Sequence, residues 1–206
     1  MIRALAFFLL LVLLPSISWA QNGAGRGEKG QSRLWLDEES KLTIFVSTNV
    51  NSFPCEYKST VKSETIEFQY LTKDHQTVEI QNASLQFPLG LFDCGQKVKN
   101  KEFKELLNEE EHKNIVINLN GLRIHEDDSN NVMGKFITTI QVAGVLKQEE
   151  IDITDIISDH ESSIYSGSVT INIRDYGLEP PVKFLGLVKV NEAVKIDFEF
   201  RFVATE

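Results

Sequence analysis

The chain has 206 residues and a formal net charge of −9 at neutral pH, with 30 acidic against 21 basic residues. An acidic protein repels phosphate backbones and anionic lipid surfaces, so this charge argues against nucleic-acid binding. The length suits one ordinary domain with enough apolar residues for a core.

Residues 1–20 are typical of a secretory signal peptide. Arg3 is the charged start, residues 7–14 form an unbroken apolar run, and Ser18 and Ala20 are small residues at the two positions that matter for cleavage. The run is too short to span a bilayer as a helix. We therefore expect no integral membrane span and a mature protein that is periplasmic or secreted. Residues 21–31 contain four glycines and predict a flexible leader, followed by a single domain over residues 32–206.

Alternating apolar and polar side chains predict β-strands in the first half of this domain. The pattern indicates strands at 34–36 and 42–46, a polar turn over 47–52, and a hairpin over 65–87 with its turn at 73–75. An amphipathic helix is expected after Cys94, with Phe103, Leu106 and Leu107 on one face and Asn100 as its N-cap. We expect this helix to plug or flank one end of the sheet.

The strand pattern resumes after the helix, at residues 115–119, 136–145, 151–156, 164–173 and 184–190, with a polar loop over 125–131. The last strand, residues 194–202, alternates Val, Ile and three Phe with charged residues, so one face is apolar and the other charged. About eight to ten strands with short connections and one helix predict an all-β, up-and-down antiparallel sheet, most economically closed into a barrel.

Two cysteines, Cys55 and Cys94, are most simply interpreted as a disulfide in an oxidising compartment. Metal binding and thiol catalysis are weaker interpretations, because neither cysteine has a close His or Cys partner and the chain has no C-x-x-C motif.

The histidines give no support to an enzyme. All four lie in polar, loop-like stretches, and the spacing of each from the nearest carboxylates and serines does not match a catalytic arrangement. They are His75, His112, His125 and His160. We therefore predict no catalytic residues and no metal site. A hydrolase with a polar site at the rim of the barrel is the least favoured hypothesis.

The inward faces of the predicted strands form a candidate ligand site that contains no Lys, Arg, Asp or Glu. Its residues are Phe136, Ile140, Val169, Ile171, Ile173, Val194, Ile196, Phe198 and Phe200. Eight strands enclose a space that side chains can fill or that can hold one small molecule. Two interpretations stay open: a carrier that binds an apolar amphiphile by burial, and a solid-core structural or interaction module of the envelope or stress response.

Residues 174–181 connect two of the last strands. Gly177 can adopt positive φ, and Pro181 pushes Pro180 away from helical angles. This segment is interpreted either as a rigid connection or, together with the helix, as a rim that controls access to one mouth of the barrel.

Several stretches, taken in order, resemble the YceI-like family of exported bacterial proteins: residues 47–53, 92–95, 100–107, 174–181 and 185–190. The similarity runs from Arg33 to Phe202. It implies a lipocalin-like, eight-stranded antiparallel barrel whose apolar lumen holds a polyisoprenoid, an isoprenoid quinone or a similar lipid. The function expected from the resemblance is non-enzymatic binding, sequestration or transport of that lipid, with no other cofactor. Pairing of two barrels as a homodimer is left open.

Overall fold

A computed structural model describes residues 27–58, 65–126, 132–159, 161–183 and 188–204. This part of the chain is an antiparallel β-sheet with one α-helix, α2 (Lys97–Leu106). The strands and the two 3-10 helices are β1 (Lys29–Leu36), β2 (Lys41–Ser47), β3 (Ser52–Tyr57), β4 (Ile66–Thr72), β5 (Thr77–Pro88), η1 (Leu89–Leu91), β6 (Phe92–Asp93), β7 (Asn114–Glu126), β8 (Val132–Val142), β9 (Val145–Ser158), β10 (Ser162–Asn172), η2 (Ile173–Tyr176), β11 (Val182–Lys183), β12 (Val188–Lys189) and β13 (Ala193–Ala204).

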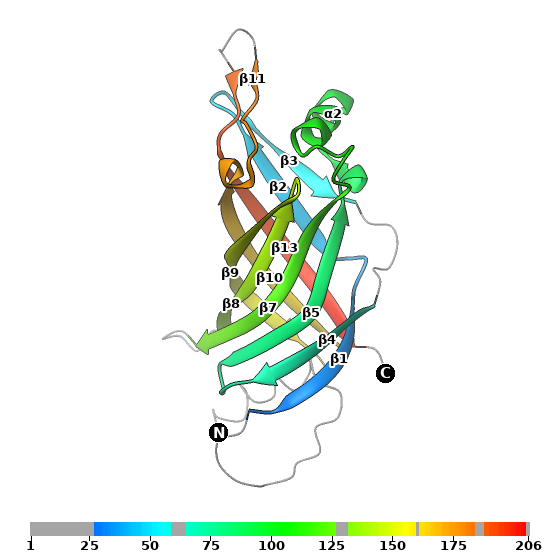
Figure 1. Cartoon of the computed structure of the whole chain (residues 1–206), viewed down its shortest axis with the longest axis vertical. Coiled ribbons are helices and arrows are strands. Elements are labelled where there is room, and N and C mark those ends of the chain that lie inside the picture. The colour runs from blue at the N-terminus through cyan, green and yellow to red at the C-terminus, as the bar shows by residue number, and fades with distance from the viewer. Residues whose placement is uncertain (1–26, 59–64, 127–131, 160, 184–187, 205–206) are drawn as a thin grey trace.

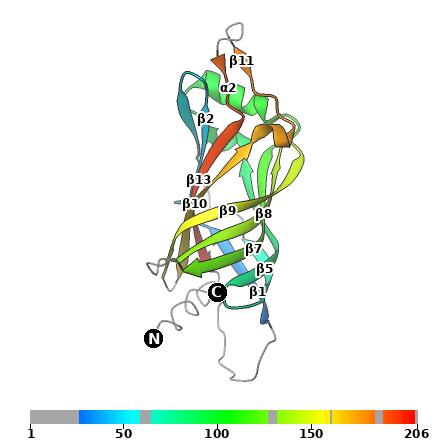
Figure 2. The same cartoon turned by 90° about the vertical axis from the view of Figure 1, so that its left-hand side faces the viewer.

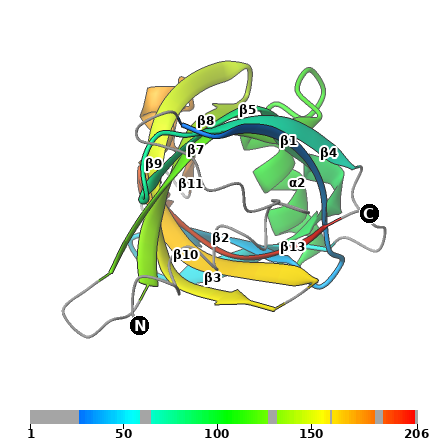
Figure 3. The ribbon, with the colours of Figure 1, turned by 90° about the horizontal axis from the view of Figure 1, so that it is seen from below.

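Eight of these strands close into a ring. Their order is β1-β4-β5-β7-β8-β9-β10-β13, and β13 pairs with β1 to complete the circle. Figure 1 shows the ring from the side, with α2 at the end that we call the upper end, and Figure 3 shows it from below. The predicted all-β, eight-stranded antiparallel barrel with one short helix is therefore confirmed.

Strand β13 pairs with three other strands. β10 lies along one of its edges, and β1 and β2 lie one after the other along the opposite edge. Residues 34–36 of β1 pair with 202–204, and residues 41–45 of β2 pair with 195–199. Between them, the Asp37 amide donates to the Arg201 carbonyl at 2.8 Å. Strands β3 and β6 continue from β2 and extend the wall at the upper end (Figure 2).

The alternation in β13 places its apolar face inside the barrel, as predicted. Phe198, Phe200 and Phe202 are each at most 6% exposed, whereas Glu199 and Arg201 lie on the other face. Fully burying one such side chain contributes roughly 1.5–3 kcal/mol, so this row of rings is a large part of the core.

A glycine in β10 makes room for one of these rings. The pairing of β10 with β9 shifts register between Ser166 and Gly167. A Cβ atom at Gly167 would lie 2.0 Å from the Asp152 carbonyl oxygen and 2.7 Å from the Phe198 ring. The close approach of β9 and of Phe198 therefore requires glycine at this position.

The prediction of one strand over residues 136–145 is wrong, because a hairpin turn divides it. β8 ends at Val142 and β9 begins at Val145, and the two residues between them, Ala143 and Gly144, have φ of 47° and 82°. Two consecutive residues with positive φ match the right-handed twist of the flanking strands. Apolar side chains on both sides of the turn conceal it in the sequence pattern.

Three other boundaries differ from the prediction. β1 begins at Lys29, inside the predicted leader, and Gly30 pairs with Tyr70 of β4. In the region predicted as a strand over 184–190, β12 forms a two-residue ribbon with β11, and residues 184–187 lie outside the described residues. β7 extends to Glu126, into the predicted loop, of which residues 127–131 are not described.

The predicted signal peptide and residues 21–26 of the leader also lie outside the described residues. Within the described ranges, no helix has the length and apolar character needed to cross a membrane.

Candidate ligand-binding lumen

An apolar cavity lies in the upper half of the barrel, below α2. The volume open to the centre of a water molecule is about 70 Å³. Strands β2, β7, β8, β9, β10 and β13 build its wall, and α2 and η2 close its upper end. The lining side chains are Leu42, Ile44, Val46, Phe103, Leu106, Leu107, Ile115, Ile117, Ile140, Val142, Ile151, Val169, Ile171, Ile173, Tyr176, Leu178, Val190, Val194, Ile196, Phe198 and Phe200. Apart from one phenol, this lining is hydrocarbon, so it can bind only by burying apolar surface.

Eight of the nine predicted lumen residues line this upper cavity. They are Ile140, Val169, Ile171, Ile173, Val194, Ile196, Phe198 and Phe200. Ile173 belongs to η2 and not, as predicted, to the end of a strand. Phe136 is buried but faces a second cavity further down the barrel. The structure therefore divides the predicted set between two spaces.

Five aromatic rings form a layer across the lumen between these two spaces. Ring centroids are 4.9 Å apart for Phe198 and Phe200, 6.3 Å for Phe200 and Phe202, and 5.9 Å for Phe202 and Tyr165. Phe136 completes the circuit, 5.2 Å from Tyr165 and 6.3 Å from Phe198. We call these five residues the aromatic layer. Such tilted and edge-on pairs are the geometries that aromatic quadrupoles favour.

The lower cavity is also apolar and holds about 60 Å³ open to the centre of a water molecule. Its lining comes from β1, β4, β5, β7 and β8 and from three members of the aromatic layer, Phe136, Tyr165 and Phe202. Both cavities are smaller than the roughly 300–1,000 Å³ of a typical small-molecule pocket. In the described part of the barrel, one layer of rings thus separates two small apolar spaces of the lumen.

The model of the YceI-like domain matches residues 35–202 of the sequence. The chain belongs to the YceI-like family. This confirms the resemblance noted in the sequence, and the matched range runs from the end of β1 into β13 and includes every strand between them.

Solved structures with the same fold include other proteins of this class. A polyisoprenoid binding domain from Saccharophagus degradans, implicated in plant cell wall breakdown, has a TM-score of 0.56 and 12% identity, over 84% of this chain and 98% of that one. BcnA from Burkholderia cenocepacia has a TM-score of 0.52 and 12% identity, over 81% and 98% of the two chains. At this identity the likeness shows a shared fold. No curated protein matches the sequence.

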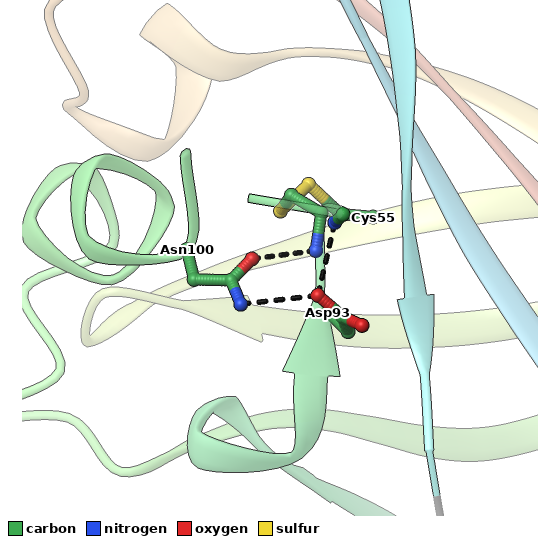
Figure 4. The surroundings of a disulfide bond; sticks show 5 residues. Cys55, Asp93 and Asn100 are labelled. Atoms are coloured by element: carbon green, nitrogen blue, oxygen red, sulfur yellow. Dashed lines mark hydrogen bonds between the residues drawn. A yellow bond between two sulfur atoms is a disulfide. The ribbon is translucent and has the colours of Figure 1, made fainter. Parts of the chain in front are cut away.

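A disulfide fastens the upper wall of the YceI-like barrel. Cys55 of β3 and Cys94, which follows β6, are bonded across a sequence separation of 39 residues, as predicted. Both are buried. The bond therefore joins the β2–β3 hairpin to the chain that enters α2 (Figure 4).

Asn100 ties α2 to this disulfide but is not its N-cap. The helix begins at Lys97 after Gln96, so the predicted cap lies in its first turn. The Asn100 Oδ1 atom accepts from the Cys94 amide at 2.6 Å, and its Nδ2 donates to Asp93 Oδ1 at 3.1 Å (Figure 4). The hydrogen bond from Asn100 and a second one from the Gly95 amide lower the pKa of Asp93.

Two buried tyrosines border the lumen and remain neutral. Burial raises the pKa of Tyr165 in the aromatic layer. Burial, followed by the nearby Glu149 carboxylate, raises the pKa of Tyr176 at the upper end, where the Tyr176 hydroxyl donates to Glu149 Oε1 at 3.2 Å. Both phenols therefore keep their protons at neutral pH.

The described part of the chain contains no group of three or more His, Cys, Asp or Glu side chains that could hold a metal ion. His160 lies outside the described residues.

The structure adds residues that sequence reasoning did not assign to the lumen. Phe103, Leu106 and Leu107 close the upper cavity from above, and Tyr176 and Leu178 border it beside them. The spacing of the three helix residues on one face was the signal that could have placed them there. Gly177 has φ of 73°, as predicted, which lets the chain reverse directly after η2.

Proposed function

We propose that this protein binds a long apolar amphiphile, such as a polyisoprenoid or an isoprenoid quinone, inside the barrel without covalent chemistry. The observation that carries the proposal is the upper cavity, whose lining is hydrocarbon except for the Tyr176 hydroxyl. The polyisoprenoid binding domain from Saccharophagus degradans, which shares the fold, supports this class of ligand.

The driving force for such binding is the burial of apolar surface. At roughly 25 cal/mol per Å², a tail of several hundred Å² gains several kcal/mol after the cost of ordering it. A lining without charged groups selects for apolar area and shape and gives little directional preference.

A long tail requires the aromatic layer to move. Each cavity holds at most about 70 Å³, so a chain of several isoprene units has to displace Phe198 or Phe200 from the positions described above. Side chains change rotamer at far lower cost than a backbone rearrangement, so this movement is compatible with an intact ring of strands.

The same small cavities favour a second candidate function, a solid-core structural or interaction module that acts through its outer surface. In that case the aromatic layer is a permanent part of the core and the cavities are ordinary packing defects.

We also propose that the mature protein is exported to the periplasm or secreted. The signal-like residues 1–20 support this proposal, and so does a disulfide, which is rare in reducing compartments. Fractionation of cells that express the full chain, with sequencing of the mature N-terminus, tests it. A mature protein that begins at Gln21 in the periplasmic fraction is the expected result, and retention of the full chain in the cytoplasm contradicts it.

Mass spectrometry of protein purified without detergent separates the two candidate functions. The native mass and an organic extract should reveal an apolar ligand in a fixed ratio to the protein, and the same mass reports whether one or two barrels are present. Repeated empty extracts, with no mass shift after addition of polyprenols, contradict the carrier and support the solid-core module.

A further inference from the structure

On one side of the barrel, the described strands leave part of one strand edge without a partner strand. The upper half of β5, from Ala83 to Pro88, pairs with β7 on one edge. On its other edge, β4 pairs only with residues 78–81, and no strand in the described ranges pairs with residues 83–88. Figure 1 shows β5 continuing upward beyond the point where β4 begins. Among the described residues, no partner strand meets the backbone donors and acceptors along this edge of residues 83–88.

A cavity occupies this gap, which we call the side window. It is bounded by the turn between β1 and β2, the first residues of β4, and the upper half of β5. The volume open to the centre of a water molecule is about 350 Å³, five times that of the upper cavity. Its lining is mixed, with apolar side chains on the inner side and hydroxyl, amide and charged groups at the rim.

One aromatic contact separates the side window from the lumen. Phe200 lines both the window and the upper cavity. Phe87 stacks on it with centroids 5.7 Å apart and planes at 16°, and is only 1% exposed. Tyr57 meets the Phe87 ring edge-on at 5.2 Å. Rotation of these two phenylalanine rings would join the window to the upper cavity without breaking a strand pairing.

The rim of the window offers hydrogen bonds without a free positive charge. The Asn114 and Gln86 amides bond to one another at 3.1 Å, which leaves a donor on Gln86 and an acceptor on Asn114. Among the described residues, the Ser84 hydroxyl has no hydrogen-bond partner. The one cation at the rim, Lys41, is paired with Glu199 at 2.8 Å, and Asp37 adds a negative charge nearby. These groups suit an uncharged head group better than an anion.

We propose that the side window is the head-group site of the bound amphiphile and its route into the barrel. This inference rests on the proposed binding function. An uncharged head with a hydroxyl or carbonyl oxygen lies among Ser84, Gln86 and Asn114, and the apolar tail passes Phe87 and Phe200 into the upper cavity. The ligand class is accordingly a neutral isoprenoid alcohol or quinone, and not a phosphorylated or carboxylated one.

The test uses all-trans-retinol, an isoprenoid alcohol whose fluorescence rises in apolar surroundings, added to the full mature chain. Gln86→Trp places a large ring in the window, and Gln81→Trp makes the same change at an exposed position of β5 outside it. The association rate of retinol should fall at least tenfold in Gln86→Trp and stay at the wild-type value in Gln81→Trp. Circular dichroism and urea unfolding establish that both variants fold.

A second measurement on the wild-type protein needs no variant. At pH 8, retinol should bind at least tenfold more tightly than retinoate, which has the same tail with a carboxylate head. If retinol associates equally fast with both tryptophan variants and wild type binds retinol and retinoate equally tightly, the proposed head-group site in the side window is wrong. Retinol binding itself would still support the carrier function. If neither retinol nor a longer prenol binds to wild type, the proposed function fails, and the window fails with it.

Discussion

Phe198 is part of the alternating pattern of β13, of the buried core and of the candidate site. Its ring lies in the aromatic layer, over Gly167, and also borders the upper cavity. The neighbouring residue Glu199 points outward and pairs with Lys41, with both side chains largely in water. Adjacent positions of one strand therefore have opposite environments.

Substituting these two neighbours provides a matched comparison. Phe198→Glu should place an unpaired carboxylate in an apolar layer and cost several kcal/mol of unfolding free energy, or abolish ligand uptake where the fold survives. Glu199→Ala should change stability by less than about 1 kcal/mol, because an exposed ion pair contributes little. Urea unfolding and retinol binding measure both effects. Similar losses at the two positions would contradict the inward direction of Phe198.

Asp93 makes stability depend on pH at the upper end. Hydrogen bonds from Asn100 and Gly95 lower its pKa in the folded state. Its stabilising contribution is therefore fully present above the unfolded pKa, about 3.9, and is lost as the pH falls through the lowered folded pKa. Asp93→Asn should be less stable than wild type at pH 7, and the difference should shrink below about pH 4.

Urea unfolding of wild type and Asp93→Asn at pH 7, 5 and 3 measures this effect. Asn100→Ala removes the main donor and should reproduce part of the loss at pH 7. A difference between the proteins that is the same at all three values would show that the carboxylate charge plays no part.

At the scale of elements, the disulfide connects the β2–β3 hairpin to the start of α2. By the chain-entropy relation, cross-linking a loop of this length stabilises the folded state by about 4 kcal/mol. The double variant Cys55→Ala, Cys94→Ala should lose about that amount of unfolding free energy. Dithiothreitol should destabilise wild type and leave the double variant unchanged. A loss below about 1 kcal/mol in the variant would mean that the hairpin is held by other contacts.

The sequence predicted most strands because each has one solvent-exposed polar face and one buried apolar face. In β13 the period of two is uninterrupted, and in β10 it survives with one glycine that the bulge explains. The β8–β9 turn was missed because Val142 and Val145 continue the apolar pattern across it. Asn100 was assigned to the wrong role because an asparagine near a helix start is usually a cap, and only the fold brings Cys94 beside it.

The sequence could predict which side chains of the candidate site face the lumen, but not the position or shape of the cavities that they line. Alternation shows which side chains point inward, and eight of the nine predicted residues do meet around one cavity. Alternation contains no information about the height of each side chain in the barrel, so Phe136 was grouped with residues of the upper cavity although it lines the lower one. The side window depends on where β4 begins relative to β5, which is a matter of strand register across the sheet.

Considered as a whole, the molecule is a barrel divided in two by the aromatic layer. Phe136→Ala removes one ring of the layer and should join the lower cavity to the upper one. We expect a loss of about 3–5 kcal/mol in stability, together with a shift in preference towards longer chains. Val142→Ala enlarges the upper cavity without opening the layer and serves as the control.

Displacement of retinol by geraniol, a short prenol, and by solanesol, a long one, measures the preference. The ratio of their affinities should move towards solanesol in Phe136→Ala and stay at the wild-type value in Val142→Ala. An unchanged ratio in both variants would mean that the layer does not limit the length of chain the barrel accepts.

The position of β13 also determines when the barrel can form during biosynthesis. Arg201 donates its backbone amide to Ser40 across 161 residues, and the same strand supplies the missing neighbour of both β1 and β2. Until β13 emerges, those early strands expose one free edge and the side chains of Leu36 and Leu42 to water and to other nascent chains. Contacts this distant in sequence form slowly, so we expect closure of the ring by β13 to be a late step of folding.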